Sequence, residues 1–304
     1  MFRRLGLVTT TTLSFTLSFT LSFLCAATPA ATTPAAASLA VPVTAATAPR
    51  PVNVAHRGAS AYAPENTVAA FRLAAEQDAD MYELDVQETA DHHLILMHDT
   101  TLARTTDAET VFPDRAPWRV GDFTLAEIRR LDAGSWFGRG HDGERVPTLG
   151  ETLRAMRGSG LGLLLEVKAP HLYPGIEARV AAELRRDPAL LAPGRLVVQS
   201  FDWDSIRRFH RIMPRVPVGL LGTPPVERLP ELAAFADQIN PPHHAVTSAY
   251  VGRVHGLRMR VFTWTVDDPA TMRRLTAQRV DGIITNKPDV LRAVLDGSPR
   301  RRAA

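Results

Sequence analysis

Short apolar runs alternate with longer amphipathic stretches along most of this chain. Nine runs have the length and the aliphatic or β-branched content of strands, and they cover residues 52–57, 81–86, 94–98, 162–168, 196–201, 216–221, 237–240, 259–266 and 281–285. Stretches with helical spacing of apolar positions separate them at residues 66–77, 149–157, 176–186, 205–213, 226–236 and 269–278. This alternation predicts parallel strands with helices packed outside them.

The third run breaks the alternation, because the connector before it is too short for a helical crossover. A crossover between parallel strands needs a dozen residues or more, so the third run is predicted to fold back antiparallel on the second. A two-residue turn at Asp91 and His92 would pair Thr89 with the first residue of the third run. In that register Asp85 lies opposite His98.

Eight runs remain for a parallel set once this hairpin strand is set aside. The count predicts an α/β fold of the TIM (β/α)8 barrel type rather than an open sheet. The segment at about residues 99–147 has no clear period and is too long for an ordinary loop. A small insertion subdomain is therefore expected after the second strand's hairpin, at the barrel end where active sites lie.

Acidic residues interrupt the apolar pattern near the ends of two of these runs. Glu83 and Asp85 are two residues apart, so their side chains share one face of a strand. Glu166 and Lys168 repeat this spacing in the fourth run. Three carboxylates without a nearby cysteine suit a hard cation, Ca²⁺ or Mg²⁺, rather than zinc. The sequence therefore predicts one divalent cation held by Glu83, Asp85 and Glu166.

Histidines and cationic side chains accompany the carboxylates at the predicted strand ends. His56 and His98 are candidates for a general base and a general acid, since imidazole titrates near neutral pH. Arg57 offers a bidentate fork to a phosphate group and Lys168 a point charge. The combination predicts cleavage of an anionic phosphoester. Two further polar or aromatic strand ends complete the candidate set, namely Gln199 and Trp264.

The first fifty residues carry no acidic side chain and follow a different pattern. Arg3 and Arg4 precede an apolar, Thr- and Ser-rich run from Leu5 to Leu24, and small residues and prolines follow. This predicts a secretory signal peptide and leader over residues 1–50, and hence a secreted, extracellular or periplasmic protein. A membrane anchor is the alternative. Cys25, the single cysteine, lies in the leader, so the mature protein would have no disulfide.

Charge adds little to this picture. The net charge of +3 is matched by the three arginines of the first fifty residues, so residues 51–304 are neutral as a whole. A neutral body with scattered arginines argues against a nucleic-acid partner. Residues 51–298 are expected to form the barrel domain as a monomer, and the basic tail at 299–304 a solvated terminus.

The chain resembles the glycerophosphodiester phosphodiesterase family, including its lysophospholipase D-like members, at an ordered series of motifs. The series spans residues 52 to 292 and includes His56-Arg57-Gly58, Pro64-Glu65-Asn66-Thr67, Glu83-Leu84-Asp85-Val86, His98-Asp99, Arg104-Thr105-Thr106, Glu166-Val167-Lys168, Gln199-Ser200-Phe201 and Trp264-Thr265-Val266. Departures from the family pattern at Asp78, His92 and Gly150 touch none of the candidate chemistry.

The resemblance implies a barrel with a small insertion and the same site residues. It implies that the metal is bound by the three carboxylates, that His56 and His98 exchange protons, and that Arg57 and Lys168 face the phosphate. The implied reaction begins with attack of a free glycerol hydroxyl on phosphorus. An alcohol such as choline or ethanolamine then leaves, and water opens a cyclic phosphate. Which histidine is the base stays open at this point.

The substrate also stays open, because glycerophosphodiesters and lysophospholipids both carry the free hydroxyl. Apolar residues expected at the mouth, among them Tyr62, Trp136, Phe201 and Trp264, would suit an alkyl chain and transient contact with lipid aggregates. Two other classes are alternatives to an esterase. One is a secreted barrel that binds such lipids without turnover, and the other is a metal-dependent sugar isomerase.

Overall fold

The computed structural model describes Ser14, Thr16, Ser18 and residues 50–297. The predicted signal peptide, with its cleavage site, and the basic tail therefore lie essentially outside the described residues. The fold described below belongs to the unit of residues 47–304. Within the part of the chain that the structure describes, no helix is long and apolar enough to cross a membrane.

Eight parallel strands close into a barrel. They are β1 (Val52–Ala55), β2 (Met81–Glu88), β4 (Gly162–Val167), β5 (Leu196–Ser200), β6 (Val218–Leu221), β7 (Gln238–Asn240), β8 (Arg260–Thr263) and β9 (Gly282–Thr285). Closure follows from β1, which pairs in parallel with both β2 and β9. The ninth strand, β3 (Leu94–Leu96), pairs antiparallel with β2. The predicted TIM barrel with a hairpin strand is confirmed.

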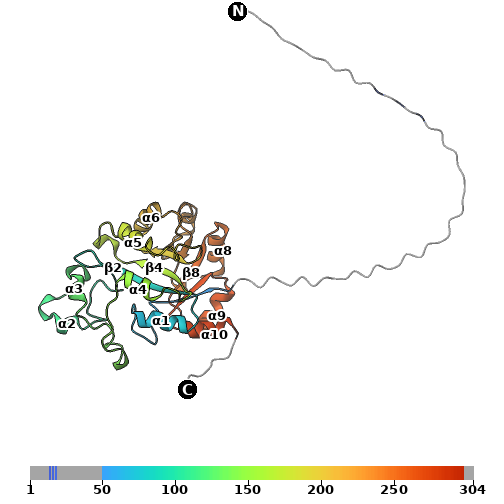
Figure 1. The fold of residues 1–304 in the computed structure, drawn as a ribbon. Coiled ribbons are helices and arrows are strands. Elements are labelled where there is room, and N and C mark those ends of the chain that lie inside the picture. Colours follow the sequence, from blue (N-terminus) through green and yellow to red (C-terminus); the bar gives the residue numbers. More distant parts are fainter. Residues whose placement is uncertain (1–13, 15, 17, 19–49, 298–304) are drawn as a thin grey trace, which may run out of the picture. The chain divides into compact units, whose positions relative to one another are not determined.

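Helices cover the outside of the barrel (Figure 1). They are α1 (Val68–Glu76), α4 (Leu149–Ala155), α5 (Ile176–Leu184), α6 (Trp203–Ile212), α7 (Leu229–Leu232), α8 (Ser248–Gly256), α9 (Pro269–Ala277) and α10 (Pro288–Leu295). The sequence prediction missed α8 and α10. It also made the helix at 226–236 too long, because Pro230 is tolerated only in a first turn and α7 begins at Leu229.

The hairpin register differs from the prediction by one residue. The Met97 N–H donates to the Asp85 carbonyl oxygen at 3.0 Å, so Asp85 lies opposite Met97 and not opposite His98. The turn has three residues, 90–92, because His92 adopts a φ of 63° in the left-handed region. His98 lies beyond the end of β3, so strand alternation does not fix the direction of its side chain.

The segment between β3 and α4 forms a subdomain beside the barrel (green in Figure 1). It contains α2 (Ala108–Val111), α3 (Leu125–Ile128) and the 3-10 turns η1 (Pro113–Arg115), η2 (Val120–Asp122) and η3 (Arg139–His141). Its apolar side chains form a core distinct from that of the barrel, with Leu102, Phe123 and Leu131 fully buried. This core holds the insertion together at the mouth of the barrel.

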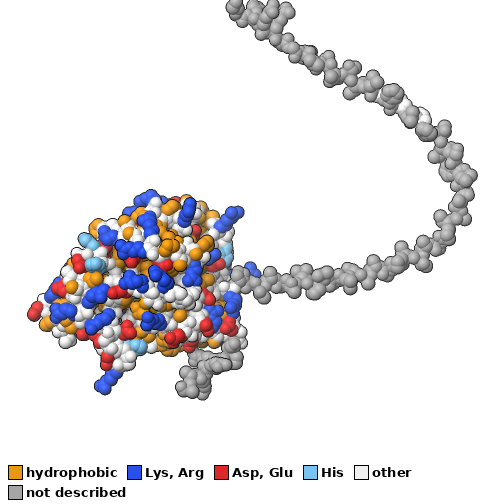
Figure 2. Space-filling model, viewed as in Figure 1, with side chains coloured by type: hydrophobic (Ala, Val, Ile, Leu, Met, Phe, Trp, Pro, Cys, Tyr) orange, Lys and Arg blue, Asp and Glu red, His pale blue; other side chains and the backbone are white. Residues whose placement is uncertain are grey.

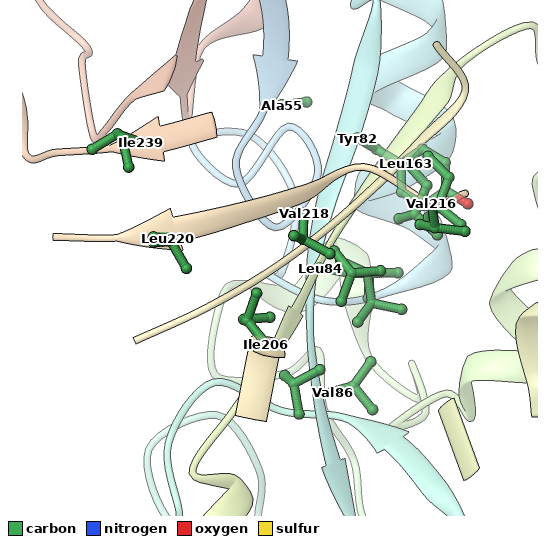
Figure 3. Close-up of a cluster of buried hydrophobic side chains, with 14 of the residues drawn as sticks. Ala55, Tyr82, Leu84, Val86, Leu163, Ile206, Val216, Val218, Leu220 and Ile239 are labelled. Atoms are coloured by element: carbon green, nitrogen blue, oxygen red, sulfur yellow. The ribbon is translucent and has the colours of Figure 1, made fainter. Parts of the chain in front are cut away.

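Apolar side chains on the outer face of the strands pack against the helices. Leu84 and Val86 of β2, and Val218 and Leu220 of β6, belong to this layer with Ile206 of α6 (Figure 3). On the outer surface, Lys and Arg side chains are scattered among acidic and apolar ones over the face seen in Figure 2.

The inner face of the strands carries an apolar layer beneath a polar one. Six mostly apolar side chains fill the barrel interior: Val54, Met81, Leu164, Val197, Phe262 and Ile284. Two residues further along each chain segment the side chains are polar or aromatic: Glu83, Glu166 and Gln199 are still within their strands and so on the same face, and His56, Trp264 and Asn286 stand just past the strand ends. The apolar layer is therefore the floor of the site, and the barrel fold places the polar residues together above it.

Candidate active site

Three carboxylates of the neighbouring strands β2 and β4 meet inside the barrel. The parallel pairing of these strands sets Asp85 beside Glu166. One oxygen from each of Glu83, Asp85 and Glu166 lies within 4.8 Å of the others, and all three residues are buried. Asp85 Oδ1 accepts no hydrogen bond from the described residues, and Lys168 Nζ lies 3.3 Å from it. An orphaned buried oxygen within an all-oxygen donor set fits a hard divalent cation.

Electrostatics within the triad supports the same conclusion. Burial, together with the neighbouring carboxylates, raises the pKa of Glu83. Burial and the Asp85 charge likewise raise the pKa of Glu166 to about 8. Burial acts in the same direction on Asp85, but the Lys168 and Arg57 charges hold its pKa below the usual value. A divalent cation among the three would stabilise all of the carboxylates in their charged form.

Arg57 connects the first strand to the carboxylates. Its backbone N–H donates to Glu83 Oε2 at 2.8 Å, and its Nε lies 3.3 Å from Asp85 Oδ2. Its Nη1 donates to Glu65 Oε1 at 3.0 Å. The backbone of Arg57 has a φ of 55°, and such left-handed residues concentrate where the fold must hold a side chain in place.

Gly58 allows this turn to pack against α1. Its φ is +83°, and a Cβ added to it would lie 2.6 Å from the carbonyl carbon of Ala70. Glycine is the residue that adopts such a φ without strain and leaves room for the approaching backbone. The close approach of turn and helix in turn fixes the position of Arg57 and His56.

A pocket of about 150 Å³ lies over the triad, and it collects nearly all of the predicted site residues. Among the residues that line it are His56, Arg57, Glu83, His98, Glu166, Lys168, Gln199 and Trp264. Asp85 does not line this pocket, although its carboxylate belongs to the triad beneath it. A larger depression of about 480 Å³ lies between the insertion and α4 and contains none of these residues. The smaller pocket is therefore the candidate active site, because it gathers the residues whose chemistry the sequence singled out.

The two histidines reach the pocket from different parts of the fold. His56 follows β1, and its Nδ1 lies 2.7 Å from Asn286 Oδ1. His98 follows β3, and its Nδ1 lies 2.7 Å from Asp99 Oδ1. Burial lowers the pKa of His56 to about 4 and also lowers the pKa of His98. Cationic neighbours also lower the pKa of each histidine.

The remaining candidates form the wall of the pocket. Lys168 Nζ lies 2.7 Å from Glu166 Oε1. Gln199 Oε1 accepts a hydrogen bond from Asn240 Nδ2 at 2.7 Å. The Trp264 indole N–H donates to the Asn240 carbonyl oxygen, and its ring meets Phe201 edge-on at 5.6 Å between centroids. Phe201 is 54% exposed, so one side of the mouth is apolar.

Several polar residues of the site were not among the sequence candidates. Asn66 donates to Asp85 Oδ2 at 2.8 Å, although the apolar pattern places it only at the start of the helical stretch 66–77. Glu65, Asp99 and Arg104 form an ion-pair network next to His98, and Asn286 contacts His56. Asn286 could have been found, because it stands two residues after the apolar Ile284, the spacing that also relates Glu83 to Met81 and Glu166 to Leu164.

Comparison with known proteins identifies the family of the chain. Residues 56–290 match the model of the glycerophosphoryl diester phosphodiesterase family. A glycerophosphodiester phosphodiesterase of Bacillus subtilis is 36% identical over 265 residues, which cover 82% of this chain and 87% of the relative. The crystal structure of a putative glycerophosphoryl diester phosphodiesterase from Silicibacter pomeroyi has a TM-score of 0.70 at 31% identity, covering 82% of this chain and 94% of that one.

A second solved structure carries a ligand. It is an Oleispira antarctica phosphodiesterase in complex with the product sn-glycerol-3-phosphate, with a TM-score of 0.72 at 28% identity, covering 81% of this chain and 97% of that one. The fold and the family match define a TIM-barrel phosphoric diester hydrolase of a metal-dependent family, and the acidic triad is a group that could hold the metal. The chain belongs to the glycerophosphoryl diester phosphodiesterase family, as the motif series predicted. The isomerase and the non-catalytic binding barrel are not favoured.

Proposed function

We propose that this enzyme cleaves glycerophosphodiesters and lysophospholipids on the head-group side and releases an alcohol such as choline or ethanolamine. The observation that carries the proposal is the meeting of three buried carboxylates, two histidines, Arg57 and Lys168 around one small pocket. Glycerol phosphate bound in the Oleispira structure is the other product of such a cleavage. A Ca²⁺ or Mg²⁺ ion held by the triad would stabilise charge on the phosphoryl oxygens.

Different side chains of the pocket carry out the binding and proton-transfer steps of this reaction. Arg57 and Lys168 bind the phosphate oxygens and orient the diester. One imidazole takes the proton of the free glycerol hydroxyl, whose oxygen forms a bond to phosphorus. The bond from phosphorus to the head-group oxygen breaks, and the other imidazole gives that oxygen a proton. Water then opens the cyclic phosphate while the two proton transfers run in reverse.

A three-substrate assay tests this function. The purified protein is incubated with glycerophosphocholine, lysophosphatidylcholine or phosphatidylcholine, in Ca²⁺, Mg²⁺ or EDTA, and choline is measured. We expect choline from the first two substrates in the presence of one of the ions, and none in EDTA. Equal release from the diacyl lipid would exclude attack by a neighbouring hydroxyl. Loss of turnover in folded His56→Ala and His98→Ala variants would identify the two proton-transfer residues.

The exposed apolar side chains of the mouth support contact with lipid aggregates. Tyr62 follows β1, Leu172 follows β4, Phe201 follows β5 and Val226 follows β6, and each is a large apolar residue with substantial exposure. The loops after the strands of a TIM barrel share one face, so these side chains surround the entrance. An alkyl chain would extend over this rim, since the pocket has a volume of only about 150 Å³.

Leu191 provides a matched control for this part of the proposal. It is 39% exposed but lies on the loop before β5, at the opposite end of the barrel. We expect Phe201→Ser to weaken co-sedimentation with lysophosphatidylcholine micelles and to slow their hydrolysis, while glycerophosphocholine turnover is retained. Leu191→Ser should change neither. Equal effects of the two substitutions would contradict a lipid-facing rim.

Secretion and a monomeric state complete the proposal. The basic, apolar and small-residue sequence of residues 1–50 supports export followed by removal of the leader. N-terminal sequencing of the protein recovered outside the cytoplasm would locate the cleavage site, and an uncleaved cytoplasmic protein would contradict export. Light scattering during size-exclusion chromatography would give the mass in solution, and a dimer mass would contradict the monomer.

A further inference from the structure

His98 lies on a stretch of chain that the β-sheet does not hold. β3 ends at Leu96, and the last backbone hydrogen bond of the hairpin runs from the Met97 N–H to the Asp85 carbonyl oxygen. Among the described residues, His98 and Asp99 take part in no backbone–backbone hydrogen bond. The backbone groups of such a stretch need side-chain partners, and these partners then decide where the stretch lies.

The side chain of Gln87 binds this stretch at two points. Gln87 belongs to β2, two residues beyond Asp85 on the same face of the strand, and it is fully buried. Its Nε2 donates to the Met97 carbonyl oxygen at 2.7 Å and to the Asp99 carbonyl oxygen at 2.6 Å. These two acceptors belong to the residues on either side of His98. One amide group therefore fixes the backbone immediately before and after the histidine.

The orientation of the Gln87 amide is fixed by its partners. The hydroxyl of Tyr173, on the loop after β4, donates to Gln87 Oε1 at 2.9 Å. The two carbonyl oxygens can only accept, so the amide nitrogen must face them and the amide oxygen must face the hydroxyl. Both residues are buried, and any other orientation would leave buried polar groups without partners. Tyr173 therefore holds the amide in the orientation that binds the His98 backbone.

We propose that Gln87 is a positioning residue for His98 and that Tyr173 supports it by holding the amide. The proposal rests on the proposed function, in which the His98 ring exchanges a proton with the substrate. Gln87 does not line the pocket, so it acts through the backbone of His98 and not by contact with the substrate. Its loss should displace the imidazole, and a displacement of about 1 Å can lower the rate on the order of 100-fold.

Two substitutions of graded severity test the proposal. Gln87→Met keeps the length of the side chain and removes the amide. We expect kcat for glycerophosphocholine to fall about 10- to 100-fold, while KM changes less than about 2-fold. Hydrogen–deuterium exchange of the backbone amides should become faster at residues 97–100. Tyr173→Phe removes only the hydroxyl, so it should give the same pattern with a loss of about 2- to 10-fold, and it tests the proposal even if Gln87→Met fails to fold.

Two buried groups of the same kind provide matched controls. Asn53 of β1 is a fully buried amide whose Nδ2 donates to the Pro288 carbonyl oxygen at 2.9 Å. Tyr250 of α8 is buried, and its hydroxyl donates to the Pro224 carbonyl oxygen at 3.0 Å. Asn53→Leu and Tyr250→Phe each remove a buried hydrogen bond and should lower Tm. They should leave kcat per folded molecule, and exchange at residues 97–100, as in the wild type.

A double-mutant cycle shows whether Gln87 acts through His98. Residual turnover of His98→Ala is followed with the p-nitrophenyl ester of glycerol 3-phosphate, and adding Gln87→Met should cause no further loss. The same loss in both backgrounds, or a loss in Asn53→Leu as large as in Gln87→Met, would overturn the proposal. A wild-type enzyme that cleaves no glycerophosphodiester would instead overturn the proposed function. Unchanged exchange at residues 97–100 in Gln87→Met would overturn the positioning role in either case.

Discussion

Replacing Gly58 by alanine tests how the turn after β1 holds the active site. Gly58 has a φ of +83°, and adopting this conformation costs an alanine about 1 kcal/mol. The added Cβ would also lie 2.6 Å from the carbonyl carbon of Ala70, which is helix backbone and can give way only if turn and helix separate. Overpacking of this kind costs about 1–3 kcal/mol. The expected total is about 2–4 kcal/mol.

Gly158 separates the two contributions. It has the same φ of +83°, but no atom lies within 4 Å of the Cβ that an alanine would add. Gly158→Ala should therefore lose about 1 kcal/mol, from backbone strain alone. For a domain of this size each kcal/mol lowers Tm by about 2–4 °C. We expect a fall of about 2–4 °C for Gly158→Ala and about 4–16 °C for Gly58→Ala.

Calorimetry of the two variants measures the stability difference, and the choline assay measures its effect on the site. The displacement of the turn in Gly58→Ala should carry Arg57 and His56 with it and lower kcat, since small misplacements of catalytic groups are costly. Gly158→Ala should retain full activity. Equal falls in Tm for the two variants would refute the reasoning, because the contact with α1 would then contribute nothing.

The remaining predictions concern the triad, the floor and one helix cap. Glu83→Gln should lower kcat at least about 100-fold and weaken Ca²⁺ or Mg²⁺ binding in calorimetric titrations, and unchanged affinity would exclude Glu83 as a ligand. In the folded protein the pKa of Glu166 is raised from 4.5 to about 8. In EDTA, the protonated carboxyl should therefore stabilise the fold at low pH, and this stabilisation should be lost as pH rises through about 8. The difference in Tm between wild type and Glu166→Gln should follow this pH dependence in EDTA and disappear when the metal is restored. Phe262→Ala should cost about 3–5 kcal/mol in denaturant unfolding, since its ring is almost fully buried in the floor, and a loss below about 1 kcal/mol would show a loosely packed interior. Thr148→Ala should cost about 1 kcal/mol by removing the capping box with Glu151, and an unchanged unfolding free energy would contradict that.

Much of the barrel and of its metal triad could be predicted from the sequence, because strand alternation carries that information. Glu83 and Asp85 share a face in any strand, and the parallel partner of β2 brings Glu166 beside them. The count of apolar runs was enough to indicate that the sheet closes into a barrel. The prediction missed α8 and α10, although Thr247 caps the first, and Pro288 begins the second and is followed by an apolar stripe of Val290, Leu291, Val294 and Leu295.

The residues that orient the histidines were harder to predict, because they depend on distances in three dimensions. Glu65 and Arg104 are far apart in the sequence and meet only where the insertion folds back on the first loop. The hairpin register failed for a local reason. His92 takes a left-handed conformation that adds one residue to the turn, and hydrophobic pattern alone does not report it.

The apolar floor has a consequence for the order of events in the barrel. Phe262 and Ile284 help to seal the lower end of the interior, so traffic to and from the metal passes through the mouth alone. The alcohol product would therefore leave, and the water would enter, through the same opening of the barrel. In the proposed reaction, an alcohol held against Phe201 would delay the water, and a slowly released head group should prolong the life of the cyclic ester.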